Sequence, residues 1–411
     1  MVADIIPFTE LLSAIVDNRG RSCPVGEYGV PLIATNCIGN ETLYPKYETK
    51  RFVDEKTHRT WFRGHPQPGD ILFVCKGSPG RTNLVPDPVD FCIAQDMVAV
   101  RADPKKVYSN YLLAVLRSPY VLSQIDNMHV GTMIPHFKKG DFDKLMIPVP
   151  DWASQKIIGD IYLLFSKKIE LNRRANRTLD AMARALFKSW FVDFDGVPQE
   201  RMQEVGPSAI PKGWRIGKLT ELAVLNPESW TKKTCPDEIK YIDLSSTKWG
   251  RIESVASFSK ENAPSRAQRV LRPCDTIFGT VRPGNGSYAL IDENGLTGST
   301  GFAVLRPKNK EYAAFVYLAA TAPDNIETLA GLADGGAYPA VRAEVIGETA
   351  VVIADDNNIS DFSLSVMPLL EKISKNEDQS KILTKIRDTL VSKLISGELR
   401  VKNFEHITEI I

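Results

Sequence analysis

The residue types that most often perform catalysis are present in this sequence, but their spacing matches no catalytic or metal-binding motif. Neither the phosphate-binding pattern GxxxxGK[ST] nor the zinc-binding pattern HExxH occurs. No histidine stands at zinc-ligand spacing from a cysteine, and no CxxC pair is present, which favours buried free thiols. The histidines are His58, His65, His129, His136 and His406, and the cysteines are Cys23, Cys37, Cys75, Cys92, Cys235 and Cys274. The sequence therefore predicts no catalytic residue and no metal site.

Three short stretches resemble enzyme motifs but lack a residue that the chemistry needs. "LNPES" (225–229) begins like the NPP-aromatic motif of amino-methyltransferases, yet it lacks the aromatic residue that stacks on a flipped base. "PDEIK" (236–240) is similar to the PD…ExK nuclease signature, but Asp237 and Glu238 are adjacent and would point apart in an extended chain. "RPGNGSY" (282–288) lacks the third glycine of a dinucleotide fingerprint. These departures favour a binding protein over an enzyme.

Length and composition indicate a globular protein of several domains. The chain has 411 residues, of which 43% are hydrophobic and 25% are charged, so two or three domains are expected. No apolar run approaches the roughly 20 residues that span a bilayer, and the first residues lack the features of a secretory signal. We therefore expect a cytoplasmic protein. The net charge of +1 does not decide whether the protein binds nucleic acid.

The two halves of the sequence repeat each other at a shift of about 205 residues. "PGDILFVCKGSPG" (68–80) aligns with "PCDTIFGTVRPGNG" (273–286), which places Asp70 on Asp275 and Phe73 on Phe278. At a shift of 204, 131–150 aligns with 335–354. Several matches in the same order indicate an internal duplication. Each half contains short β-branched and aromatic runs between turn residues, then a short helix, then a long helix.

The long helices carry apolar stripes that need a partner. Residues 164–191 contain neither glycine nor proline, and apolar residues recur there every three or four positions. Because a whole globular half separates the two helices, we expect them to pair antiparallel and to bury their stripes against each other. The expected helix-pair core is Ile161, Phe165, Ile169, Asn172, Leu179 and Leu186 with Leu369, Ile373, Asn376, Leu383, Leu390 and Leu394.

The two asparagines in the stripes permit two interpretations. A buried amide would penalise slipped registers, because a shifted partner would leave it unpaired. Alternatively, both asparagines lie on a solvated edge of the stripe. The first helix has eight basic and three acidic residues over 152–192, which is ordinary for a solvated face. Phe187, Trp190 and Phe191 nevertheless suggest that another protein docks at its end.

These patterns predict an α+β fold. Two globular mixed α/β domains, related by pseudo-twofold symmetry, would be joined by two long antiparallel helices that form a coiled coil. The expected segments are 1–150 (first domain), 151–192 (first helix), 193–212 (linker), 213–357 (second domain), 358–400 (second helix) and 401–411 (tail).

This arrangement resembles the specificity subunit of a type I DNA restriction and modification enzyme over essentially the whole chain. The resemblance is carried by "KKIELNRRANRTLDAMARALFKSWFVDFD" (167–195), "GDILFVCKGSPG" (69–80), "YIDLSS" (241–246) and "GTMIPHFKKGDFDKLMIPVP" (131–150). It implies a non-catalytic subunit whose halves are target recognition domains, each reading one part of a split, asymmetric site in double-stranded DNA. The helices would act as a ruler and as a platform for two modification subunits. Those partners would bind S-adenosylmethionine and methylate adenine, and a restriction subunit would use ATP and Mg²⁺, so this chain would bind no cofactor itself.

The candidate DNA-reading residues lie in loops and carry side chains with hydrogen-bonding reach. Arginine pairs with guanine, asparagine with adenine, and lysine with phosphate. The candidates are Lys76, Ser78, Arg81, Thr82, Asn83, Thr132, His136 and Lys138 in the first half, and Arg282, Asn285, Ser287, Tyr338 and Arg342 in the second. Each of them is also compatible with an ordinary solvated turn.

Two other functions stay open at this point. A self-contained DNA methyltransferase or restriction enzyme would need a cofactor loop and a catalytic motif, which the sequence lacks. A coiled-coil scaffold that binds only proteins would show no preference for any DNA sequence. Two readers held at a fixed separation suit a split site, because base edges repeat their orientation about every 10–10.5 bp.

Overall fold

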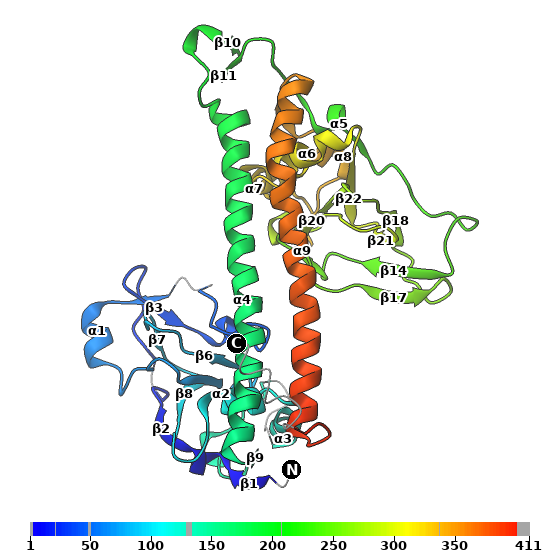
Figure 1. Ribbon diagram of the computed structural model, residues 1–411. Coiled ribbons are helices and arrows are strands. Elements are labelled where there is room, and N and C mark those ends of the chain that lie inside the picture. Colours follow the sequence, from blue (N-terminus) through cyan, green and yellow to red (C-terminus); the bar gives the residue numbers. More distant parts are fainter. Residues whose placement is uncertain are drawn as a thin grey trace. The chain divides into compact units, whose positions relative to one another are not determined.

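The computed structural model describes residues 3–20, 22–47, 51–128, 134–206, 208–336 and 338–400. The chain divides into two compact units: Met1–Arg173 with Glu377–Ile411 form the first, and Arg174–Asn376 form the second. The two long helices, α4 (Trp152–Lys188) and α9 (Asp356–Ile395), continue from one unit into the other, so each unit contains part of both (Figure 1).

The first unit is built on a four-stranded antiparallel sheet. Its strand order is β2 (Leu12–Val16), β8 (Met97–Ala102), β5 (Ile71–Val74), β6 (Thr82–Leu84). A smaller sheet has the order β4 (Phe52–Val53), β3 (Val30–Ile33), β7 (Cys92–Ile93), in which β3 and β7 are parallel. β1 (Asp4–Pro7) pairs with β9 (Met146–Val149). The helices of the globular part are α1 (Glu55–Thr60), α2 (Ser109–Leu116) and α3 (Pro119–Met128), with 3₁₀ turns at Phe8–Leu11, Thr35–Cys37 and Lys139–Asp141.

The second unit repeats this topology. Its main sheet has the order β13 (Ala223–Leu225), β22 (Phe302–Pro307), β19 (Thr276–Gly279), β20 (Tyr288–Leu290). A second sheet has the order β17 (Ala256–Ser259), β14 (Glu238–Ile242), β21 (Leu296–Ser299), β18 (Ala267–Val270), in which β14 and β21 are parallel. The paired short strands are β12 (Arg215–Lys218) with β23 (Ala350–Ile353), β15 (Thr247–Lys248) with β16 (Arg251–Ile252), and β10 (Met202–Val205) with β11 (Ser208–Pro211). The helices are α5 (Leu219–Leu222), α6 (Ala313–Ala320), α7 (Pro323–Leu332) and α8 (Ala343–Gly347), with 3₁₀ turns at Gln199–Arg201, Pro283–Asn285 and Lys310–Tyr312.

The duplication predicted from the sequence extends to the register of the strands. Ile71 of β5 faces Val100 of β8, and Thr276 of β19 faces Leu305 of β22, which is the same pairing 205 residues later. β5 and β19 are buried along their whole length, because each pairs with a strand on either side and packs in the core of its unit. The two globular parts are therefore two copies of one fold.

Both long helices begin with the same cap. The Asp151 carboxylate accepts a hydrogen bond from the Ser154 backbone N–H at 2.9 Å, and Asp355 accepts one from Asn358 at 3.0 Å. Such a side chain satisfies one of the free N–H groups of the first turn. α4 ends in a π-helical turn, Ser189–Asp193, followed by Phe194 in the left-handed conformation. Beyond the end of α9, Gly397 has a φ of +78°, as is common after a helix C-terminus.

The long helices pair antiparallel within each unit, as predicted (Figure 1). In the first unit, Asn172 donates to the Gln379 side chain at 2.8 Å, and Ser166 accepts from Arg387 at 3.1 Å. In the second unit, Asn376 donates to the Asn176 side chain at 2.8 Å. Because lower numbers on α4 meet higher numbers on α9 throughout, the helices run in opposite directions.

The structure places the residues of the expected helix-pair core in two burial classes. Neither class is solvent-exposed, and both asparagines are buried and hydrogen-bonded. Buried are Ile161, Ile169, Asn172, Asn376 and Leu394; partly buried are Phe165, Leu179, Leu186, Leu369, Ile373, Leu383 and Leu390.

The buried stripe of α4 is wider than the sequence pattern indicated. Ile158 and Tyr162 pack with Tyr111 in the core of the first unit, so this stretch of α4 faces both α9 and its own globular part. Trp190 is only partly buried against the core of the second unit, but the suggestion that Phe187 and Phe191 dock another protein is wrong. The Phe187 and Phe191 rings are buried in the core of the second unit, where the centroids of the Phe191 and Phe315 rings lie 4.8 Å apart. Among the helices that the structure describes, none has the length and apolarity that a membrane span requires.

Candidate nucleic-acid interface

In each unit the structure joins two candidate loops that are far apart in the sequence. In the first unit, the Gly77 N–H donates to the Pro135 carbonyl at 2.9 Å, and the Phe137 N–H donates to Cys75 at 2.8 Å. In the second unit, the Arg282 N–H donates to Pro339 at 2.7 Å, and the Val341 N–H donates to Thr280 at 2.9 Å. These are equivalent contacts, 204–205 residues apart. We call residues 75–81 with 134–138 the first loop pair, and residues 280–287 with 338–342 the second loop pair.

The first loop pair presents cationic side chains. Lys76, Arg81 and Lys138 are exposed, and within the described ranges none of them forms an ion pair. Ser78 and His136 are half-buried, and His136 forms a backbone bridge with Lys76. Thr132 lies outside the described residues. The exposed lysine and arginine side chains have the charge and reach that phosphate and base contacts require.

An ion-pair cluster supports the base of the first loop pair. Arg19 forms a bidentate pair with Asp17, with both distances at 2.9 Å, and Lys139 approaches the same carboxylate at 3.5 Å. The hydrogen bond from Arg19 is the largest cause that lowers the pKa of Asp17, to about 2, against the opposing effect of burial. Asp17 therefore stays ionised and holds Arg19 and Lys139 beside the loops.

The structure corrects three of the predicted DNA-contacting residues. Thr82 and Asn83 are fully buried in β6, and Ser287 lies at 8% exposure directly before β20. Asn83 donates to the carbonyls of Gly39 and Thr42 at 3.1 and 2.8 Å. The Ser287 hydroxyl donates to the Leu244 carbonyl at 2.9 Å. Because their polar groups are used inside the fold, these side chains do not face DNA.

The second loop pair presents a different chemistry. Arg282, Asn285, Tyr338 and Arg342 are all exposed. The guanidinium carbon of Arg282 lies 4.9 Å from the centroid of the Tyr338 ring, within the range of a cation–π interaction. Arg342 directly precedes α8.

An arginine that the sequence analysis did not single out connects the four-stranded sheet to the long helix α4 in each unit. Arg117 donates to the Thr82 hydroxyl at 3.0 Å, to the Thr42 carbonyl at 2.8 Å, and to the hydroxyl of Tyr162 on α4 at 2.8 Å. In the second unit, Arg184 on α4 donates to the Thr321 carbonyl at 2.8 Å and approaches the hydroxyl of Tyr288 on β20. No local pattern marks these arginines, because their partners lie far away in the sequence.

Trp249 is a third residue that the sequence analysis missed. It lies in the turn between β15 and β16, and 59% of its surface is exposed. Its backbone N–H donates to the Gly286 carbonyl of the second loop pair at 2.6 Å. The available signal was the glycine after Trp249 in "STKWGRI", because glycine between two short strand-like runs marks a turn.

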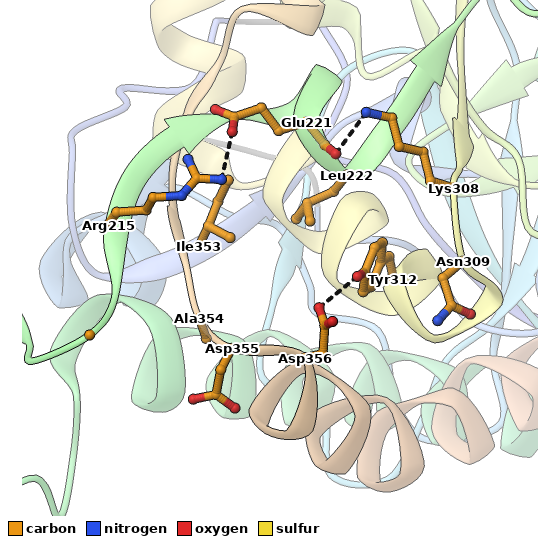
Figure 2. Close-up of a pocket in the computed structure, with 11 residues that line it drawn as sticks. Arg215, Glu221, Leu222, Lys308, Asn309, Tyr312, Ile353, Ala354, Asp355 and Asp356 are labelled. Carbon is orange, nitrogen blue, oxygen red and sulfur yellow. Dashed lines mark hydrogen bonds and ion pairs between the residues drawn. The ribbon is translucent and has the colours of Figure 1, made fainter.

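A hollow of about 670 Å³ in the second unit lies at the start of α9. Figure 2 shows that its charged groups face one another. Arg215 pairs with Glu221 at 2.6 Å, the Lys308 ammonium donates to the Glu221 carbonyl at 2.9 Å, and Tyr312 donates to Asp356 at 2.7 Å. The Glu221 bonds join β12 and the segment after β22 to α5, and the Tyr312 bond joins the turn before α6 to α9, so the hollow has a structural role. Within the described part of the chain, no three His, Cys, Asp or Glu residues are grouped to hold a metal ion.

Comparisons with known proteins agree with this geometry. The family described as "Type I restriction modification DNA specificity domain" matches residues 22–181. The MjaIX specificity subunit of Methanocaldococcus jannaschii is 24% identical over 91% of this chain and 87% of its own length. The HindI specificity subunit of Haemophilus influenzae is 23% identical over 80% and 86%.

A solved structure shares the fold. The S subunit of a type I restriction-modification system from M. genitalium is 18% identical, and the alignment covers 90% of this chain and 93% of that one, with a TM-score of 0.53. The similarity in fold therefore extends over both units of this chain. Over most of its length this chain is therefore similar to specificity subunits of type I restriction enzymes, and residues 22–181 match the DNA specificity domain of that family.

Proposed function

We propose that this chain reads a bipartite, asymmetric site in double-stranded DNA, with one half-site for each loop pair. The observation that carries the proposal is the repetition of one scaffold with different side chains at equivalent positions. Lys76 corresponds to Val281, Gly77 to Arg282, and Ile134 to Tyr338. Because base edges are read by side chains and not by the scaffold, the two half-sites are expected to differ.

The paired helices would set the distance between the half-sites. In each unit a half-buried arginine, Arg117 or Arg184, holds the four-stranded sheet to α4. Hydrogen-bonded asparagines inside the helix pair, Asn172 and Asn376, resist a change of register because slippage would leave the amides unpaired. A stiff helix pair of this kind would hold two readers at a fixed number of base pairs.

Catalysis belongs to the partner subunits. Specificity subunits are the non-catalytic members of type I complexes, and S-adenosylmethionine and ATP are held by the modification and restriction subunits. We propose that two modification subunits dock on the outer faces of the long helices. Apolar side chains are exposed there without a partner in the described chain: Leu164, Leu171, Met182, Leu364, Ile382 and Ile386.

Mapping of methylated adenines tests this function. The chain is co-expressed with its modification subunit in a host that lacks other adenine methylation, and methylated sites are read by long-read sequencing. We expect one two-part motif with unlike ends and a constant gap. Methylation without a sequence preference would favour a protein-binding scaffold, and methyl transfer by the purified chain alone would favour a self-contained enzyme.

A further inference from the structure

The turn Arg282–Gly286 in the second loop pair is flanked by two exposed aromatic rings. At its first residue, the Arg282 guanidinium lies over the ring of Tyr338, which is 72% exposed. At its last residue, Gly286 contacts Trp249, and the backbone N–H of Trp249 donates to the Gly286 carbonyl. A Cβ atom on Gly286 would lie 2.5 Å from the indole, so only glycine permits this contact. The cation and both rings are thus held by one short turn.

Two residues of this group adopt a backbone conformation that bulky side chains rarely take. Trp249 has a φ of +49° and Arg282 a φ of +48°. Left-handed backbone at a non-glycine residue is strained and is concentrated at functional sites. The burial of Trp249 does not explain the conformation, because more than half of its surface is exposed. The Gly286 and Tyr288 contacts hold the ring in place, with the Tyr288 centroid at 6.1 Å.

Among the described residues of the first unit, no such group stands at the equivalent place. Trp249 follows the end of β14 by seven residues, and Asn40 follows the end of β3 by seven residues. Asn40 is half-buried, and its side chain accepts from the Thr82 N–H at 2.9 Å, so it serves the fold. Gly77 and Ile134 stand where the second unit has Arg282 and Tyr338. The aromatic group is specific to one of the two readers.

We infer that Trp249, Arg282 and Tyr338 form a single base-step reader of the second half-site; this inference rests on the proposed function. Arg282, held flat by the Tyr338 ring, hydrogen-bonds the O6 and N7 edge of a guanine. The indole of Trp249 packs against the face of the neighbouring base, which is partly unstacked. A planar guanidinium and a planar aromatic ring on one rigid turn are suited to one base edge and one adjacent base face.

The test uses the full complex of this chain with its modification subunits. Methylated motifs are compared for the wild type, Trp249→Leu, Tyr338→Leu and Arg282→Lys. We expect each variant to lose roughly tenfold or more in discrimination at the same one or two adjacent positions of one half-site. The other half-site and the gap should not change. Ile216→Ala, an exposed apolar residue on β12 outside the loop pairs, is the matched control and should leave the motif intact.

A second measurement tests the packing of the indole directly. A duplex that carries the mapped motif, with 2-aminopurine beside the read guanine, is titrated with the wild-type complex. Unstacking raises the 2-aminopurine fluorescence, and Trp249→Leu should abolish the rise while Trp249→Phe, which keeps a ring against Gly286, retains part of it. Because Tyr338 is exposed, Tyr338→Leu gives a motif result even if Trp249→Leu unfolds.

The outcomes separate this inference from the proposed function. A wild-type two-part motif that stays unchanged in folded Trp249→Leu and Tyr338→Leu variants, or a flat fluorescence signal with the wild type, overturns the base-step reader alone. A wild type without any two-part motif overturns the proposed function, and the reader with it.

Discussion

Asp70 accepts two hydrogen bonds from Arg101, from Nε at 2.8 Å and from Nη2 at 2.9 Å, and the same pair recurs 205 residues later between Asp275 and Arg306. Both carboxylates are buried, and each also accepts a backbone N–H three residues before it. The pair joins β8 to the turn that begins β5, and β22 to the turn that begins β19. Each copy of the fold therefore contains the same buried aspartate paired with an arginine.

Removal of either arginine should destabilise its unit, because a buried carboxylate is left without its partner. We expect Arg101→Met to lower the free energy of unfolding by about 3 kcal/mol. Arg306→Met should cost a similar amount, although Arg306 also contacts Glu228, so its loss also leaves that carboxylate with one partner fewer. Urea denaturation of the purified chain measures both, and a change below about 0.5 kcal/mol would contradict the role of the pair.

The Asp17–Arg19 pair should give the first unit a pH-dependent contribution. The pKa of Asp17 is lowered to about 2, so the contribution is fully present above the unfolded-state value near 3.8 and is lost as the pH falls toward 2. The stability difference between wild type and Asp17→Asn should be largest above about pH 4 and should shrink toward pH 2. Urea denaturation midpoints between pH 2 and 6 check this, and a pH-independent difference would refute the assignment.

Arg117 and Arg184 offer a matched test of the two readers. Arg117→Met removes the bonds to Thr82, Thr42 and Tyr162, and we expect methylation to lose selectivity at one half-site only. Arg184→Met should affect the opposite half-site, because its partners lie in the second unit. Genome-wide methylation mapping distinguishes the two. Loss of both half-sites in each variant would show that the arginines act on the whole chain and not on one reader.

Lengthening both long helices should widen the gap in the DNA motif. A seven-residue insertion after Arg174 and another after Glu377 keep the apolar stripes in phase. They add about 10 Å at 1.5 Å per residue, which corresponds to roughly three base pairs. The mapped motif should keep its two ends and gain about that number of unspecified positions. An unchanged gap would show that the helix pair does not set the spacing.

The buried asparagines should lower the stability of the helix pair while they keep its register. Asn172→Leu combined with Asn376→Leu replaces amides that are 4% and 5% exposed with apolar side chains. We expect a thermal midpoint equal to or above that of the wild type, with a less uniform gap between half-sites, because slipped pairings are no longer penalised. Calorimetry and methylation mapping test the two effects, and a sharp fall in the midpoint with an unchanged gap would contradict this role.

The sequence by itself determined the elements that depend on local pattern and on repetition. The shift that aligns Asp70 with Asp275 reappears as equivalent strand registers and ion pairs. The apolar stripes on 151–192 and 358–400 indicated two long helices, because apolar residues at every third or fourth position lie on one face of an α-helix. The globular half between the two helices indicated that they run antiparallel.

Only the tertiary structure decided which side chains face outward. Thr82 and Asn83 look like turn residues in "GRTN", but the pairing of β6 with β5 and the contacts to Gly39 and Thr42 bury them. Phe191 looks like a docking residue until Phe315, more than a hundred positions later, packs against it. Trp249 stays exposed because Gly286 holds its backbone. Burial depends on contacts between distant segments, and these are specified by the packed fold as a whole and not by any window of the sequence.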